Sequence, residues 1–210
     1  MIWRIRFKLA TEKRRDFTHP ISGFSRLNFT STWTTLTSME KLLWIDMEMT
    51  GLNVDNEVPI EIAAIVTDID LKELETYHAI IKQPQEFLDR MDEWNTEHHG
   101  ESGLTAAVAT GLVPEAVEKS LMQFVDRHFH GERAVIAGNS IGQDRIFINK
   151  YFPLLNAKLH YRMLDVTSWK IMMNARFKLK FEKRNSHRAI DDIRESINEM
   201  AFYLAHVKTT

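Results

Sequence analysis

The chain has 210 residues, no cysteine and a formal net charge of −2. Without cysteine it has no disulfide scaffold, no thiolate zinc site and no cysteine nucleophile, and no apolar run reaches the roughly 18 residues that a membrane span needs. The near-neutral charge argues against a protein that coats long nucleic acid by bulk electrostatics, although it allows a local site that binds a short anion through metal.

The first 38 residues differ in charge from the rest of the chain. They hold seven basic and two acidic residues, a balance of +5 that leaves −7 for the remainder. A basic, Ser/Thr-rich and acid-poor start is typical of a mitochondrial transit peptide. Because Met39 directly precedes the first strand pattern, the segment also fits a disordered extension, a start-site artefact or a docked arm. We expect a cytoplasmic protein, or a mitochondrial one if residues 1–38 are a transit peptide.

Three strands are predicted in the first half of the body. Residues 42–49 begin with an apolar run, and residues 50–53 (TGLN) end it. Residues 58–69 are rich in Ile, Val and Ala, and residues 74–82 follow after a short turn. Short links join the three strands, so we expect an antiparallel meander.

Helices and strands alternate in the second half. Apolar spacing and cap residues predict helices at residues 114–129, 142–156, 168–177 and 187–207. Two short buried strands are predicted between them, at residues 134–137 and 163–166. This order predicts an α/β fold, in which a mixed five-stranded sheet carries helices on its faces.

Two carboxylates occur in the first predicted strand. Asp46 and Glu48 are two residues apart, so their side chains point to the same face of the sheet, and apolar residues flank both. If the strand is central and buried, the two anions repel each other and lose hydration unless a cation compensates. The alternative is an edge strand with two solvated acids.

Other polar residues lie at the starts of predicted helices. Asp144 heads the apolar face of helix 142–156, where it is either part of a site or a partner of the helix dipole. On the last helix, Asp192 borders the buried stripe, whereas Asp191 falls on the solvated side. His187, at or just before the start of that helix, is either a solvated cap residue or a general base, since the unperturbed pKa of histidine is about 6.5.

Together these positions place four carboxylates and one histidine on elements that share one sheet. Four oxygen-bearing acids without a soft ligand favour Mg²⁺ or Mn²⁺ over zinc. Two such ions about 3.5–4 Å apart can activate water and stabilise the leaving oxygen of a phosphodiester. The residues therefore predict metal-dependent phosphodiester hydrolysis.

At these residues the sequence resembles the oligoribonuclease branch of the DEDDh exonuclease family. The similarity covers about residues 41–205 and is carried by residues 44–52 (WIDMEMTGL), 138–144 (GNSIGQD), 160–166 (HYRMLDV) and 186–196 (SHRAIDDIRES). It implies a ribonuclease H-like mixed five-stranded sheet flanked by helices, with residues 39–210 as the exonuclease domain. It also implies a 3′-to-5′ exoribonuclease that degrades very short oligoribonucleotides, dinucleotides included, to nucleoside 5′-monophosphates.

The resemblance further implies a role for each site residue. The implied ligands of two Mg²⁺ or Mn²⁺ ions are Asp46, Glu48, Asp144 and Asp192, and the implied general base is His187. The implied contacts to the bases and the 3′ nucleotide are Leu52, Trp94 and His99. The implied cap on the 5′ phosphate consists of Ser140, Arg162, Thr167 and Ser168. A homodimer is implied, in which Tyr161 reaches the partner's site, and no membrane is implied.

Two other functions remain open at this point. A DEDDh exonuclease that acts on longer RNA or on DNA would need an open basic channel, which a body of charge −7 does not indicate. A non-catalytic nucleic-acid-binding module on the same fold should have lost an acid or the histidine, and none of the five is missing here.

Overall fold

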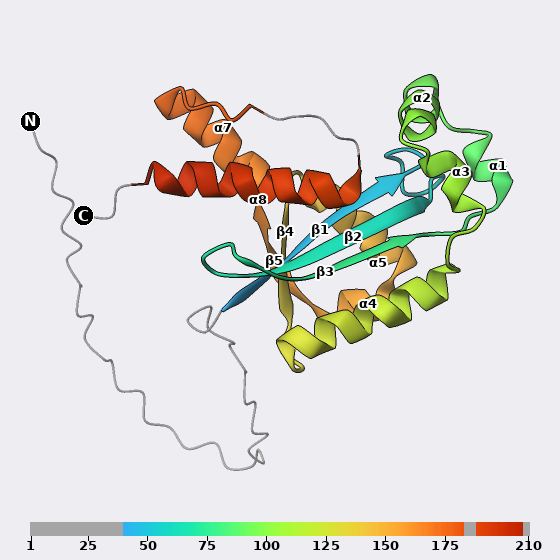
Figure 1. Ribbon diagram of the computed structural model, residues 1–210, viewed down its shortest axis with the longest axis horizontal. Coiled ribbons are helices and arrows are strands. Elements are labelled where there is room, and N and C mark those ends of the chain that lie inside the picture. Colours follow the sequence, from blue (N-terminus) through green and yellow to red (C-terminus); the bar gives the residue numbers. More distant parts are fainter. Residues whose placement is uncertain (1–39, 183–187, 208–210) are drawn as a thin grey trace, which may run out of the picture. The chain divides into compact units, whose positions relative to one another are not determined.

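The computed structural model describes residues 40–182 and 188–207 (Figure 1). The predicted extension, residues 1–38, and the predicted general base His187 therefore lie outside the described residues, and what the sequence suggests for them stays a prediction. Within the described part of the chain, no helix has both the length and the apolar character to cross a membrane.

A mixed five-stranded sheet organises the described fold, with the strand order β3-β2-β1-β4-β5. The strands are β1 (Lys41–Met49), β2 (Pro59–Asp68), β3 (Glu73–Ile80), β4 (Ala134–Gly138) and β5 (Leu159–Asp165). β1, β2 and β3 form the predicted antiparallel meander, whereas β4 pairs with β1, and β5 with β4, in parallel. β1 is therefore the middle strand, and the predicted α/β fold is confirmed.

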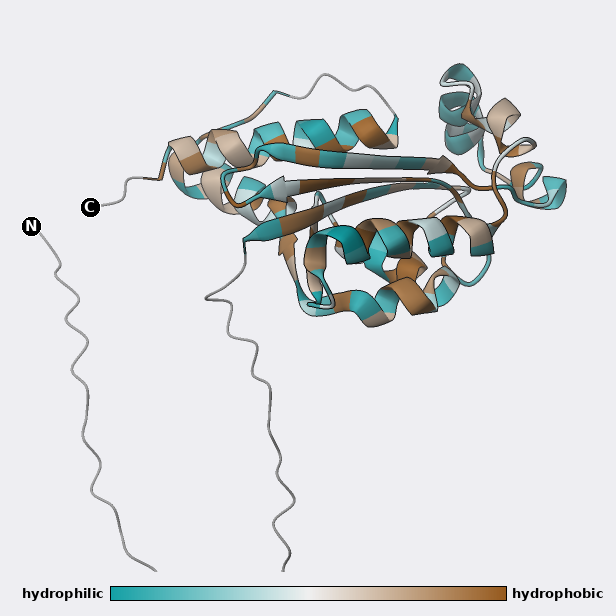
Figure 2. Cartoon of the chain, turned by 60° about the horizontal axis from the view of Figure 1, so that its bottom comes forward, coloured by the Kyte–Doolittle hydropathy of each residue, from teal (hydrophilic) through white to brown (hydrophobic). Residues whose placement is uncertain are grey.

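Helices cover both faces of this sheet (Figures 1 and 2). One face carries α4 (Pro114–Phe129), α5 (Gly142–Tyr151) and α6 (Pro153–Lys158), and the other carries α7 (Val166–Phe177) and α8 (Ala189–Ala205). Three short helices, α1 (Gln85–Leu88), α2 (Glu93–Glu101) and α3 (Leu104–Val108), gather beyond the carboxyl end of β1 (Figure 1).

Alternation along β1 divides its side chains between two hydrophobic cores. Leu43 and Ile45 pack in the core beneath α4, α5 and α6, whereas Leu42 and Trp44 pack in the core beneath α7 and α8. Successive residues of a strand point to opposite faces, so the even-numbered residues of β1 face α8. The next even-numbered residues of β1 are Asp46 and Glu48, and their side chains therefore point toward α8.

The structure differs from the sequence-based prediction at some element boundaries. The predicted helix 142–156 is two helices, because Phe152 has φ −132° and Pro153 starts α6; proline lacks the N–H that would continue the first helix. β5 begins at Leu159 rather than at 163. Helices α1–α3 were not predicted because they are short and α2, with the sequence EWNTEHHGE, has no apolar stripe.

Candidate active site

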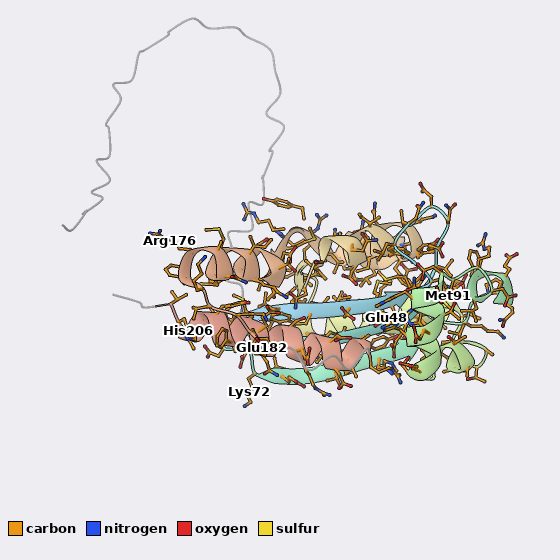
Figure 3. All side chains as sticks on the ribbon, turned by 90° about the horizontal axis from the view of Figure 1, so that it is seen from above. Glu48, Lys72, Met91, Arg176, Glu182 and His206 are labelled. Atoms are coloured by element: carbon orange, nitrogen blue, oxygen red, sulfur yellow. The ribbon has the colours of Figure 1, made fainter. Side chains whose placement is uncertain are left out.

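Three carboxylates meet near the carboxyl end of β1. Asp46 and Glu48 come from β1 and Asp192 comes from the first turn of α8, and one oxygen atom of each lies within 4.8 Å of the others. Figure 3 labels Glu48 at this end of the sheet. Because β1 is the middle strand, the alternative of an edge strand with solvated acids is wrong.

Asp144 brings a fourth carboxylate to the same strand from the first turn of α5. It is 5% exposed, and its Oδ1 accepts a hydrogen bond of 3.0 Å from the N–H of Met47, the residue between Asp46 and Glu48. Its negative charge also contributes to the raised pKa of Glu48. Asp144 is therefore coupled to the cluster and is more than a solvated partner of its helix dipole.

Mutual repulsion and burial disfavour the ionised forms of these acids. The pKa of Glu48 is raised to about 8, first by burial and then by the charges of Asp192, Glu61 and Asp144, while Arg188 opposes the shift. Burial likewise raises the pKa of Asp144, against the hydrogen bonds from backbone N–H groups. A cation among the four carboxylates would relieve this strain, because it favours their charged forms.

The donor set fits hard divalent cations. All four side chains offer carboxylate oxygens, which Mg²⁺ and Mn²⁺ prefer as ligands. Within residues 40–182 and 188–207, Asp46, Glu48 and Asp192 are the group of three acidic or histidine side chains whose ligand atoms converge. Asp191 is exposed and lies 3.9 Å from Arg194, so its prediction as a surface charge is confirmed.

The residues predicted to contact bases lie on the loop after β1 and on α2. His99 is buried, its Nε2 pairs with the carbonyl of Met49 at 3.0 Å, and its Nδ1 lies 4.0 Å from Glu48. Burial lowers the pKa of His99, which favours a neutral ring at this position. Leu52 and Trp94 are 75% and 57% exposed, so both present apolar surface to solvent.

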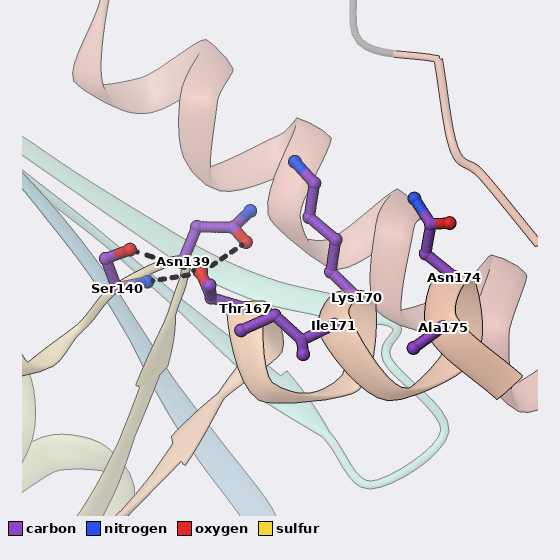
Figure 4. A pocket seen from close by; sticks show the side chains of 7 residues that line it. All are labelled: Asn139, Ser140, Thr167, Lys170, Ile171, Asn174 and Ala175. Atoms are coloured by element: carbon purple, nitrogen blue, oxygen red, sulfur yellow. Dashed lines mark hydrogen bonds between the residues drawn. The ribbon is translucent and has the colours of Figure 1, made fainter.

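A pocket of about 590 Å³ is lined by two of the predicted phosphate-binding residues, Ser140 and Thr167 (Figure 4). The N–H of Ser140 donates to the hydroxyl of Thr167 at 2.9 Å and to Asp165 at 3.1 Å. Asn139 and Lys170 line the same pocket, so its walls carry hydroxyl, amide and ammonium groups. These are all groups that can donate hydrogen bonds to an anion.

The other predicted phosphate-binding residues do not line this pocket. Arg162, on β5, is exposed, and its guanidinium lies 5.1 Å from the ring centre of Tyr161. Ser168 is exposed in the first turn of α7. Tyr161 is 68% exposed. Arg162, Tyr161 and Ser168 thus face solvent near the β5 edge of the sheet.

Hydrogen bonds along α8 connect the pocket to the acidic cluster. Asn139 donates to Ser196 at 2.8 Å and to Glu199 at 3.1 Å, and the hydroxyl of Ser196 donates to the carbonyl of Asp192 at 2.9 Å. Asn139, which lines the pocket, therefore contacts α8 one turn after Asp192.

Sequence reasoning missed two fully buried acids, Glu61 and Glu199. Each interrupts an apolar pattern: Glu61 lies between Ile60 and Ile62 on β2, and Glu199 lies beside Met200 on the buried face of α8. The same signal that singled out Asp46, an acid among residues of a core, would have found both.

Comparison with known proteins places these features in a family. A profile of the RNase T exonucleases matches residues 43–200. A protein named oligoribonuclease from Francisella tularensis subsp. tularensis is 46% identical over 169 residues, which are 79% of this chain and 95% of that protein. One of the same name from Ectopseudomonas mendocina is also 46% identical, over 79% of this chain and 94% of that protein.

Solved structures with the same fold are larger. The zinc-bound form of Escherichia coli ExoI in complex with single-stranded DNA has a TM-score of 0.63 at 16% identity, over 78% of this chain. Exonuclease I from Methylocaldum szegediense has a TM-score of 0.62 at 15% identity, over 79% of this chain. The chain spans 40% of the length of each, so the likeness identifies the fold of one part of those proteins.

In the metal-free protein, Glu48→Gln should raise the free energy of unfolding, and by more at about pH 9 than at about pH 5. The pKa of Glu48 is raised from 4.5 to about 8 in the folded state, so the stability that its protonated form provides is complete below 4.5 and is lost as the pH rises through 8. Glutamine does not ionise and avoids this loss. Urea unfolding in EDTA at both pH values measures the effect.

Glu86→Gln, on the exposed side of α1, is the control and should leave the pH dependence unchanged. A pH dependence of Glu48→Gln equal to that of the wild type would contradict the account of the buried acids.

Proposed function

This chain belongs to the RNase T exonuclease family, and on that premise we propose that it degrades very short oligoribonucleotides, dinucleotides included, to nucleoside 5′-monophosphates. It is a 3′-to-5′ exoribonuclease, as its 46% identity to proteins named oligoribonuclease indicates. The observation that supports its chemistry best is the convergence of the Asp46, Glu48 and Asp192 oxygens within 4.8 Å.

We assign two divalent ions, Mg²⁺ or Mn²⁺, to Asp46, Glu48, Asp144 and Asp192. When bound, such ions activate water and stabilise the leaving oxygen of a phosphodiester. The protein's own part is to hold the four carboxylates close together, with Asp144 buried and the other three half-buried, as the raised pKa of Glu48 reflects. We assign the role of general base to His187, which lies outside the described residues.

The substrate-binding residues follow from exposure and chemistry. The exposed apolar surfaces of Leu52 and Trp94 suit contact with bases, since stacking on a base is worth about 1–3 kcal/mol and tolerates any sequence. His99 contacts the same end of β1. A cap on the 5′ phosphate by Ser140, Arg162, Thr167 and Ser168 would measure length, because a longer chain would clash with it. Arginine suits this role through its paired donors.

A homodimer completes the proposal. β5 is an edge strand of the sheet, and it and α7 carry large exposed apolar residues, namely Tyr161, Met163, Ile171 and Met172. Edge strands and exposed apolar patches are common sites of association. We propose that a second copy of the chain covers this surface and that Tyr161 reaches the partner's site.

Asp46→Ala and Asp192→Asn should each abolish hydrolysis of a 5′-phosphorylated diribonucleotide while the fold is retained, because each removes a metal ligand. Asp191→Asn is the matched control, since it makes the same change one position away on the exposed side of α8 and should keep full activity. Release of mononucleotide measured by chromatography, with a circular dichroism melt for each variant, tests this. Undiminished turnover by Asp46→Ala would overturn the assignment.

A second candidate is an exonuclease of longer strands, because the fold is shared with an ExoI–single-stranded DNA complex. We expect the wild type to cleave 5′-phosphorylated diribonucleotides faster than RNA or DNA 20-mers when all compete in one reaction, since a capped site excludes long chains. Faster cleavage of either 20-mer would favour the second candidate. A non-catalytic module is disfavoured because all four acids are present.

We expect Tyr161→Ala and Asp46→Ala each to be inactive alone, and mixing the two should restore activity if Tyr161 acts across the dimer. In a mixed dimer of Tyr161→Ala and Asp46→Ala subunits, one site has intact acids and receives Tyr161 from its neighbour. A mixture of Asp46→Ala with Asp192→Asn subunits contains no complete site and is the control. Absence of restored activity would contradict the role of Tyr161 across the interface. A monomer by sedimentation would contradict the homodimer itself.

A further inference from the structure

Glu61, on β2, is a buried carboxylate for which the reaction outlined above has no use. Its side chain is fully buried, and its Oε1 accepts hydrogen bonds from Arg188 Nε at 3.2 Å and Nη2 at 2.9 Å, and pairs with His78 Nε2 at 2.5 Å. Its Oε2 is buried with no hydrogen-bond partner among the described residues. A buried carboxylate is costly even when it is paired, so its position calls for a reason.

The register of the sheet places Glu61 beside the acidic cluster. Glu61 on β2 is the direct cross-strand neighbour of Glu48 on β1. Side chains at such a pair point to the same face and lie about 4.5–5.5 Å apart at Cβ. Two glutamates in this position repel each other, and Arg188 supplies the positive charge beside them.

Arg188 also connects this pair to the metal ligand on α8. It is the N-cap residue of α8, and its carbonyl accepts hydrogen bonds from the N–H groups of Asp191 at 2.9 Å and Asp192 at 3.0 Å. Its side chain reaches β2 while its main chain holds the first turn of the helix. One residue therefore ties the backbone of Asp192 to the strand next to Glu48.

We propose that Glu61 is a positioning residue that clamps Arg188, and through it the first turn of α8, so that Asp192 stays within metal-binding distance of Asp46 and Glu48. The inference rests on the proposed metal-dependent function and extends it to a residue outside the ligand set. Groups that orient metal ligands are typically worth about 10- to 100-fold in metal affinity or activity. Arg188, which the clamp holds, directly follows His187 in the chain.

Binding of Mn²⁺ alone to the full chain tests the clamp. The electron paramagnetic resonance signal of free Mn²⁺ gives the dissociation constant of each variant, and a thermal melt without metal shows that the variant folds. Glu61→Gln and Arg188→Met should each weaken Mn²⁺ binding by about 10- to 100-fold. The double variant should bind Mn²⁺ no more weakly than whichever single variant has the lower affinity, because both substitutions break the same contact.

Two controls separate positioning from general stability. Glu75 accepts a hydrogen bond from Arg127 at 2.5 Å and pairs with His128 at 2.6 Å, so it has one arginine and one histidine partner, as Glu61 does. Glu75 lies near the start of β3, whereas the residue that pairs with Glu61 lies at the end of that strand. Glu75→Gln should lower the melting temperature and leave Mn²⁺ affinity unchanged. His78→Asn removes the partner of Glu61 that is not attached to α8, and it should also leave Mn²⁺ affinity unchanged.

Unchanged Mn²⁺ affinity in folded Glu61→Gln or Arg188→Met would overturn the clamp. If Glu61→Gln does not fold, Arg188→Met decides, because the arginine side chain is 34% exposed and its loss is better tolerated. Arg188→Lys, which keeps the charge and loses the planar fork, should show an intermediate loss. A wild type that binds Mn²⁺ without hydrolysing diribonucleotides would contradict the proposed function and leave the clamp standing.

Discussion

The carboxylates at the carboxyl end of β1 repel one another, and several neighbouring groups are placed so that they compensate this repulsion. Asp46, Glu48 and Asp192 converge in half-buried positions, with the buried Asp144 beside them, where solvent screens their charge less than it would on an open surface. Such an arrangement lowers stability unless positive charge is brought to it. The proposed divalent ions would fill this need, so the same residues that weaken the metal-free fold would bind them.

The fold moderates the repulsion with its own dipoles and cations. Asp144 and Asp192 both lie in the first turns of helices, where the helix dipole favours negative charge. The N–H of Met47 donates to Asp144, and Arg188 lies between the sheet and α8 near Glu48. These groups compensate part of the charge, and under the proposed function they would hold the donors in place and reduce the reorganisation that metal binding requires.

The residues proposed for catalysis and those proposed for substrate choice lie on different parts of the molecule. The acids sit on the middle strand and on helices packed against it. The groups proposed to contact substrate lie on the loop after β1, on α2, on β5 and on α7, and several of them are exposed. A body of net charge −7 is compatible with an anionic substrate because metal ions, rather than a basic channel, would meet the reacting phosphate.

Local patterns in the sequence were enough to predict the order of the strands along the chain, the α/β class and the four acids. Asp46 and Glu48 stand out as charges in an apolar strand, and Asp192 separates from Asp191 by its place on the helix. Tertiary structure alone decided that β1 is central and that Glu48 lies opposite Glu61. It also decided that Arg188 joins α8 to β2 through Glu61, a residue 127 positions away in the chain. Such pairings depend on register and packing between distant segments, and no spacing along one strand or helix encodes them.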